Sequence, residues 1–275
     1  MPLYPISFSI PEELVVREVP RKTQLFATRE KKFANETDYY TEYQRSVYGH
    51  TSKKEGWDCL RHYEILANGC IPFFIDMDQL PPLTMVDFPR KLVQQGMNGD
   101  WSVAPHLLEY TRTHLTTTAR ARYIMETLGI ANARSVLYLV NNQSPDYLRD
   151  SVLHGFKTIF GSQCVDVQKV AHMYDSYPSE AALDLYGKGF TYSRRILDEV
   201  CDRTNIDERI KQHEFDIIVY GSACWGRQPY FETVLEAYDP CEIAFLCGED
   251  GHHLTYHPKC KIDSSIFNLF KREIT

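Results

Sequence analysis

The sequence predicts an α/β fold of two Rossmann-type domains with a cleft between them. Three continuous apolar runs in the second half of the chain, residues 135–140, 215–221 and 242–248, are typical of buried strands, and helical patterns separate them. A fourth run, residues 70–75, follows a short helical pattern in the first quarter. Strands that alternate with helices indicate parallel sheets with right-handed crossovers. A length of 275 residues suits two domains.

Glycines mark two helix ends in the first half. Gly69 and Gly129 each close a helical pattern, because glycine adopts the left-handed backbone of a helix C-terminus without steric cost. The strands expected here are residues 8–19, 22–28, 46–50 and 70–75; the helices expected are 38–44, the segment between Gly56 and Asn68, 86–95 and 104–128.

The second half alternates regularly between strands and helices. Ser144 suits an N-cap and Pro145 a first helical position, for a helix that runs to about Phe160. After it we expect a strand at 164–170, a glycine-containing loop at 185–192, and helices at 194–212 and 227–238. The expected division is a donor-type domain at 1–105, a helical connector at 106–133, an acceptor-side domain at 134–265, and a segment at 266–275 that returns to the first domain.

Ligands of such sheets bind at the carboxyl ends of the strands. This rule points to the loops after Ile75, Val140, Tyr220 and Cys247. A cleft between the two domains is therefore the expected site.

Composition narrows the function classes. No apolar run reaches the length of a membrane span, and the N-terminus lacks the pattern of a secretory signal. Eight cysteines without CxxC spacing favour reduced thiols and a cytoplasmic location. A formal net charge of −7 argues against a general nucleic-acid binder.

A basic turn before the helix that follows Gly56 suggests an anion site. Lys53 and Lys54 precede the helix start, where free N–H groups and the helix dipole favour negative charge. Arg61 lies inside the helix and Glu64 follows it by three residues, so both lie on nearly the same face. A phosphate-bearing ligand would explain this arrangement.

The block from Lys53 to Phe74 resembles the nucleotide-sugar-binding segment of exostosin-like glycosyltransferases. Those proteins carry an Arg-x-x-Glu-Ala-x-x-x-Gly-Cys-Ile-Pro-Val core, and this chain has Arg61-x-x-Glu64 followed by Gly69-Cys70-Ile71-Pro72, with Ile65 in place of the alanine. The resemblance implies a GT-B fold and sugar transfer from a UDP-linked donor. The donor-like motif stands first here, so the chain looks circularly permuted. Enzymes of large DNA viruses, chloroviruses among them, are the most similar in kind.

The resemblance also implies roles for the motif residues. Glu64 would accept hydrogen bonds from ribose hydroxyls, unless it only pairs with Arg61 at the surface. Fixed cations would stabilise the departing diphosphate, and hydroxyls would bind its oxygens. Trp57 would pack on the ligand or belong to the core. The donor-binding residues implied are Thr51, Ser52, Lys53, Lys54, Trp57, Arg61 and Glu64.

Inverting transfer also needs a base for the acceptor hydroxyl. Glu249, Asp250 and His252 follow a predicted strand of the second domain and suit this role, although they equally suit a capping loop. Asp76 is a further candidate. Tyr192, Arg194 and Ser222 are the expected acceptor-binding residues. Asp76-Met77-Asp78 and the group of Asp250, His252, His253 and His257 allow a metal. GT-B enzymes usually work without one, so the resemblance implies that no metal or cofactor is required.

We therefore expect a glycosyltransferase that moves a sugar, with xylose favoured, from a UDP-sugar to a hydroxyl of an oligosaccharide or glycoprotein glycan in the cytoplasm, the host's if the protein is viral. One alternative is a non-catalytic nucleotide- or glycan-binding protein on a degenerate transferase scaffold. Another is a different α/β enzyme, such as a phosphorylase or a Rossmann dehydrogenase, and the lack of GxGxxG after Val140 disfavours the dehydrogenase.

Overall fold

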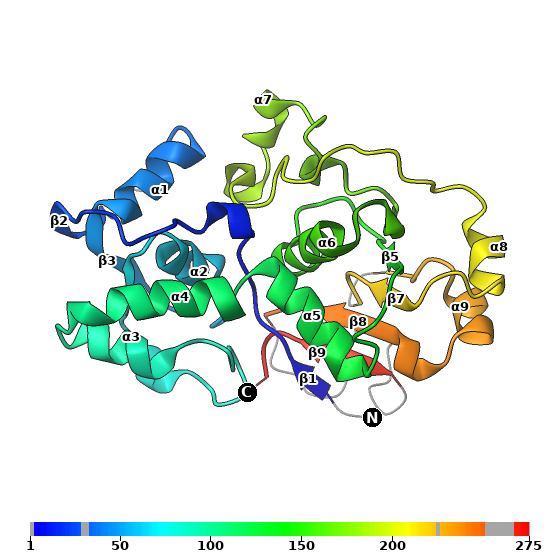
Figure 1. Ribbon diagram of the computed structural model, residues 1–275, viewed down its shortest axis with the longest axis horizontal. Helices are drawn as coiled ribbons and strands as arrows, with labels where there is room; N and C mark the ends of the chain where they lie inside the picture. The colour runs from blue at the N-terminus through cyan, green and yellow to red at the C-terminus, as the bar shows by residue number, and fades with distance from the viewer. Residues whose placement is uncertain (1–2, 29–32, 224–225, 251–266, 275) are drawn as a thin grey trace.

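The protein is an α/β structure with two parallel sheets, seen here in a computed structural model. The structure describes residues 3–28, 33–223, 226–250 and 267–274. A six-stranded sheet has the order β1-β9-β8-β7-β5-β6, and a three-stranded sheet has the order β2-β3-β4. Figure 1 shows the smaller sheet and helices α1 to α4 at one end of the molecule and the larger sheet at the other.

The strands are β1 Leu3–Pro5, β2 Gln24–Phe26, β3 Ser46–Thr51, β4 Ile71–Phe74, β5 Val136–Leu139, β6 Cys164–Val167, β7 Ile217–Tyr220, β8 Ile243–Cys247 and β9 Asn268–Lys271. The helices are α1 Glu36–Gln44, α2 Leu60–Ala67, α3 Arg90–Met97, α4 Ala104–His114, α5 Thr117–Leu128, α6 Tyr147–Phe160, α7 Ser179–Ala182, α8 Ile206–Lys211 and α9 Phe231–Ala237.

The central strands of the larger sheet are buried on both faces, which explains their unbroken apolar sequences. On β5, Val136 and Tyr138 join a core that includes residues of α5 and α6. Leu137 and Leu139, which point the other way, join a second core with residues of α8 and α9. The predicted strands at 135–140, 215–221 and 242–248 are thus confirmed, each slightly shorter than expected.

The two ends of the chain lie side by side in the larger sheet. Strand β9 runs between β8 and β1, and Leu3 is aligned with Leu269. The expected donor-type segment 1–105 therefore begins in the larger sheet. The end of the chain adds a strand there before it contacts the other part of the molecule, where the Ile274 N–H donates to Thr84 Oγ1 at 3.0 Å.

One continuous core joins the two sheets. The same cluster of buried side chains includes Val47 from β3, Leu66 from α2, Ile124 from α5 and Tyr138 from β5. Two independent domains would each be expected to have a core of their own. The two sheets are therefore packed together through shared apolar contacts.

Several expected elements differ from the structure. The helix expected at 104–128 is two helices, because Thr116 caps a new one through a hydrogen bond from the Ala119 N–H. Residues 8–19 form no long strand: Ile10 makes an isolated bridge to Thr116, and a 3-10 turn follows at Glu12–Leu14. The helix expected at 194–212 is confined to α8.

One expected helix cap also differs from the structure. Asp146, and not Ser144, caps α6, since its carboxylate accepts from the N–H groups of Leu148 and Arg149. The left-handed residues that close the helices at Gly69 and Gly129 are confirmed, with φ values of 61° and 76°. In the described parts of the chain, no helix combines the length and apolar character that crossing a membrane requires.

Candidate functional site

A cavity of about 1370 Å³ is lined from both parts of the fold. One wall comes from the end of β3 and the start of α2. The other comes from the β5–α6 loop, the loop after β8 and residues 186–190. The loops after β3, β4, β5 and β8 all reach this cavity, in line with the rule for strand carboxyl ends, whereas the expected loop after Tyr220 contributes no described residue to the lining.

Helix α2 begins on the cavity wall. Its N-cap, Cys59, has an extended backbone, and no side chain caps the helix start. Ser52, Lys54 and Arg61 line the cavity next to this start. Uncapped N–H groups and two cations together favour an anionic ligand at this wall.

Lys53 and Trp57 point away from the cavity and support the turn. Trp57 is 8% exposed, and the Lys53 ammonium lies 5.4 Å from the centre of its ring. The Lys53 N–H donates to both Asp76 carboxylate oxygens at 3.2 Å. None of these three residues lines the cavity. Trp57 is therefore a core residue, and Asp76 holds the basic turn and does not face a substrate.

Glu64 lies on the cavity wall with both oxygens occupied. Its Oε2 accepts from the Tyr39 hydroxyl at 2.6 Å, and its Oε1 accepts from the Thr191 hydroxyl at 2.7 Å. Burial raises the pKa of Glu64, against these hydrogen bonds and the charge of Arg61, which lower it. Glu64 is thus no surface salt bridge. It joins α2 to the glycine-containing loop of the other part of the molecule.

The Thr51 hydroxyl donates its proton to the buried side chain of His62. The carbonyl of Trp57 accepts from His62 Nε2 at 2.9 Å, so Nδ1 is the acceptor that the Thr51 hydroxyl meets at 2.8 Å. Burial lowers the pKa of His62 to about 4, which keeps the ring neutral. Thr51 lines the cavity but orients His62 and is not free to donate to a phosphate.

The loop after β8 forms the opposite wall with Glu249 and Asp250. Asp250 forms an ion pair with Arg272, which occupies one of its oxygens. The Glu249 carboxylate has no hydrogen-bond or ion-pair partner among the residues that the structure describes. Glu55, on the wall of α2, is the other lining carboxylate without such a partner, so Glu249 is the one that stands on the wall opposite the start of α2. His252 lies outside the described residues.

A cluster of buried charged residues lies behind this wall and consists of Asp58, Arg272 and Glu273. None of the three was among the site residues expected from the sequence. Arg272, 2% exposed, donates to the Asp58 carbonyl at 2.6 Å and to Glu273 Oε1 at 2.8 Å. Burial raises the pKa of Asp58 to about 6. A Cβ atom at Gly56 would collide with Asp250 and Glu273. The sequence feature that could have indicated this cluster is the run of three charged residues at 271–273, where β9 ends.

The expected acceptor-binding residues do not line the cavity. Tyr192 is buried and donates its hydroxyl to the Ser9 carbonyl. Arg194 is exposed and donates to the Asp175 carbonyl. Ser222 is buried and donates to Asp146 Oδ2 at 3.0 Å. The segment just before Tyr192 and Arg194 does line the cavity, whereas no described residue of the loop that carries Ser222 does.

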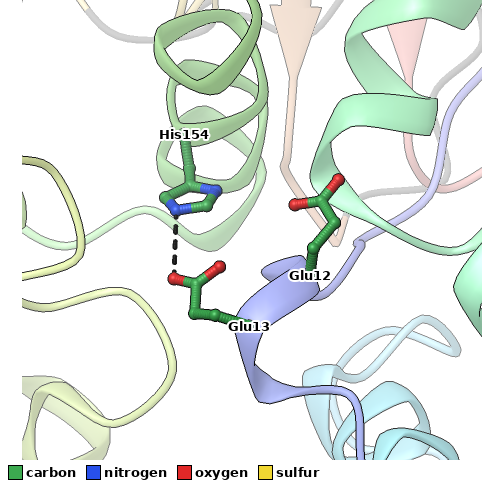
Figure 2. Close-up of side chains that lie close together, drawn as sticks. All are labelled: Glu12, Glu13 and His154. Carbon is green, nitrogen blue, oxygen red and sulfur yellow. Dashed lines mark ion pairs between the residues drawn. The ribbon is translucent and has the colours of Figure 1, made fainter. Parts of the chain in front are cut away.

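A possible metal-ligand group lies elsewhere, between the N-terminal segment and α6. Figure 2 shows Glu12 and Glu13 facing His154, and one potential ligand atom from each lies within 4.8 Å of the others. Existing contacts account for these groups. Glu12 accepts from the Thr117 hydroxyl at 3.0 Å and from the Thr118 N–H at 2.9 Å, and Glu13 pairs with His154 at 3.4 Å. The group fastens the N-terminal segment to α5 and α6, outside the cavity lining.

Comparison with known proteins gives no relative: no protein-family profile, no curated protein and no solved structure matches the chain.

Proposed function

We propose that the protein is a glycosyltransferase that moves a sugar from a UDP-sugar to a hydroxyl of a glycan acceptor. The observation that carries the proposal is the pairing of two walls in one cavity. Lys54, Arg61 and the start of α2 line one wall, and the carboxylate of Glu249, which has no partner in the described part of the chain, lines the other. The volume of about 1370 Å³ exceeds the roughly 300–1,000 Å³ typical of single-ligand pockets, so it has room for donor and acceptor together.

In the proposed reaction Glu249 acts as the general base. It takes the proton of the acceptor hydroxyl while that oxygen attacks the anomeric carbon from the face opposite the leaving group. The bond from the anomeric carbon to the diphosphate oxygen breaks, and UDP leaves with the electron pair. Lys54, Arg61 and the N–H groups of α2 stabilise the charge that develops on the diphosphate. A single displacement of this kind inverts the anomeric centre.

The choice of UDP and of a GT-B arrangement is supported by the exostosin-like motif. Arg61 and Glu64 both line the cavity, while Gly69 ends α2 and Ile71 begins β4, so the whole motif forms one helix–turn–strand unit. We further propose a permuted order of the two halves, which the neighbouring β1 and β9 strands support. Xylose as the sugar and a viral source rest on the resemblance alone.

A cytoplasmic location and independence of metals are part of the same proposal. Cys59, Cys70, Cys164, Cys201 and Cys241 form no disulfide with one another, which is compatible with a reducing compartment. Two cations and a helix start at the diphosphate position can supply the charge stabilisation that a metal ion supplies in other transferases.

The two adjacent lysines provide a matched test of donor binding. Lys54→Ala removes a cation from the cavity wall, whereas Lys53→Ala removes one that lies against Trp57. UDP should raise the melting temperature of the wild type and of Lys53→Ala, with a smaller increase in Lys54→Ala. GDP, ADP and NAD serve as comparison ligands. Stabilisation by NAD alone, or an equal UDP response in both variants, would count against the proposal.

A further inference from the structure

An exposed tyrosine stands on the cavity wall that faces away from α2. Tyr186 lines the cavity and is 76% exposed, although tyrosine normally buries much of its ring. It contacts Tyr147, a second lining residue, with the ring centres 5.8 Å apart. An open aromatic face inside a cavity is a surface on which a ligand can stack.

The surroundings of Tyr186 hold this face in position. Tyr147 is fixed by ring contacts with Phe8 and Tyr192, both at 5.9 Å. Gly187 has a left-handed backbone, with φ of 64°, and a Cβ atom there would collide with the Tyr147 hydroxyl. The Lys188 ammonium donates to the Phe33 carbonyl at 2.6 Å, which fastens the loop on its other side. The two rings therefore stand on a preformed support.

The position in the sheet also favours a ligand. Chain order reverses at β5, since β6 lies on one side of it and β7 on the other. Ligands of open parallel sheets bind in the crevice at such a switch point. The loop after β5 supplies Asn142 and Ser144 to the cavity lining, and the Asn142 carboxamide oxygen is already anchored by Arg149 at 3.0 Å.

The charge on this wall selects against an anion. Among the described lining residues, this wall carries the carboxylates of Asp146, Glu249 and Asp250 against the cations of Lys188 and Arg272. Arg272 pairs with Asp250, whereas the Lys188 ammonium donates to the neutral Phe33 carbonyl and keeps its charge. Glu249 adds a carboxylate without a partner among the described residues. An acidic ligand would meet the resulting excess of negative charge among the described residues of this wall, whereas a neutral ligand would not.

We propose that Tyr186 and Tyr147 form the acceptor subsite, and that the acceptor presents a neutral sugar ring there, not a uronic acid or a phosphorylated sugar. The C–H face of the ring stacks on Tyr186, and its hydroxyls bind the Asn142 amide and the Ser144 hydroxyl. This assignment rests on the proposed function, because it identifies the second substrate of the same cavity.

The test uses neutral and acidic sugars of matched shape. Methyl β-D-glucoside, galactoside and xyloside are compared with methyl β-D-glucuronide by saturation-transfer NMR on the full chain. At least one neutral glycoside should bind, and the glucuronide should bind about tenfold more weakly than the glucoside. Tyr186→Ala should weaken binding of the neutral sugar about tenfold, while Tyr186→Phe, which keeps the ring, should retain it.

The UDP-induced thermal shift, measured on the same samples, separates the two proposals. An unchanged UDP shift in Tyr186→Ala together with the loss of sugar binding supports the subsite. Full sugar binding by Tyr186→Ala, equal binding of the glucuronide, or no binding of any neutral glycoside overturns it, even where UDP still binds. An absent UDP shift in the wild type overturns the proposed function instead.

Discussion

Thr191→Val is expected to destabilise the protein and yet strengthen UDP binding. The Thr191 hydroxyl donates to Glu64 Oε1 at 2.7 Å and, having given its proton, accepts from the Tyr40 hydroxyl at 2.8 Å. A ribose hydroxyl that binds Glu64 Oε1 competes with the Thr191 hydroxyl for the same carboxylate oxygen. Valine has nearly the same shape as threonine, so the left-handed backbone at φ of 77° is affected equally in both proteins.

The magnitude follows from the hydrogen bond that is lost. A hydrogen bond to a charged group contributes about 1.5–3 kcal/mol to the free energy of unfolding. For a chain of this size each kcal/mol corresponds to roughly 2–4 °C, so the melting temperature should fall by about 3–12 °C. UDP, relieved of the competition at Oε1, should bind about three- to tenfold more tightly, or roughly 1 kcal/mol.

Tyr40→Phe is the matched control for this experiment. This substitution removes the Tyr40 hydroxyl, which hydrogen-bonds to Thr191, but leaves the hydrogen bond from Thr191 to Glu64. Its melting temperature should also fall, without a gain in UDP affinity. Calorimetric titration of the two variants with UDP decides the matter. Unchanged or weaker UDP binding by Thr191→Val, or an equal gain in Tyr40→Phe, would refute the assignment of Glu64 to the ribose.

Two further predictions concern stability. Burial lowers the pKa of His62 to about 4, below the unfolded value near 6.5. The contribution of neutral His62 to the free energy of unfolding is therefore complete above pH 6.5 and is lost as the pH falls towards 4. Urea unfolding across this range should show the wild type losing roughly 3 kcal/mol of stability relative to His62→Gln. Arg272→Met should cost about 3–5 kcal/mol, since it strands buried Glu273 and Asp58. Arg227→Met, which breaks a pair at an 83% exposed arginine, should cost less than about 1 kcal/mol. Equal losses in the two arginine variants would contradict the importance of the buried cluster of Asp58, Arg272 and Glu273.

Much of the larger sheet was predictable because burial on both faces leaves a plain sequence pattern. Strands β5, β7 and β8 are continuous apolar runs between polar loops. Strands β1 and β9 are short, and they pair across almost the whole length of the chain. No local signal encodes such a pairing, so the sequence did not place the two termini in one sheet.

Local periodicity also failed where a single side chain redirects the backbone. The helical pattern from 104 to 128 contains neither glycine nor a mid-helix proline, yet it breaks at Thr116, whose hydroxyl is able to cap the next helix. Residues 194–205 have a helix-compatible composition, but Arg194 and Asn205 have left-handed backbones. Tertiary contacts decide such segments.

The site was predictable as a region and not residue by residue. The motif drew attention to Arg61 and Glu64, and both residues line the cavity. Sequence alone could not separate Lys54 from Lys53, because neighbours in a turn can face opposite directions. Nor could it separate Glu249 from Asp250, because the partner of Asp250 is Arg272, more than twenty residues away.

The most direct test of the account is the turnover of UDP-sugars by Glu249→Gln. Glutamine keeps the shape of the side chain but cannot accept the acceptor's proton. We expect the variant to melt at the wild-type temperature and to show the full UDP-induced shift, with transfer to a glycan acceptor about 10²- to 10⁴-fold slower. Transfer at the wild-type rate by Glu249→Gln, or no transfer by the wild type from any UDP-sugar, would contradict it.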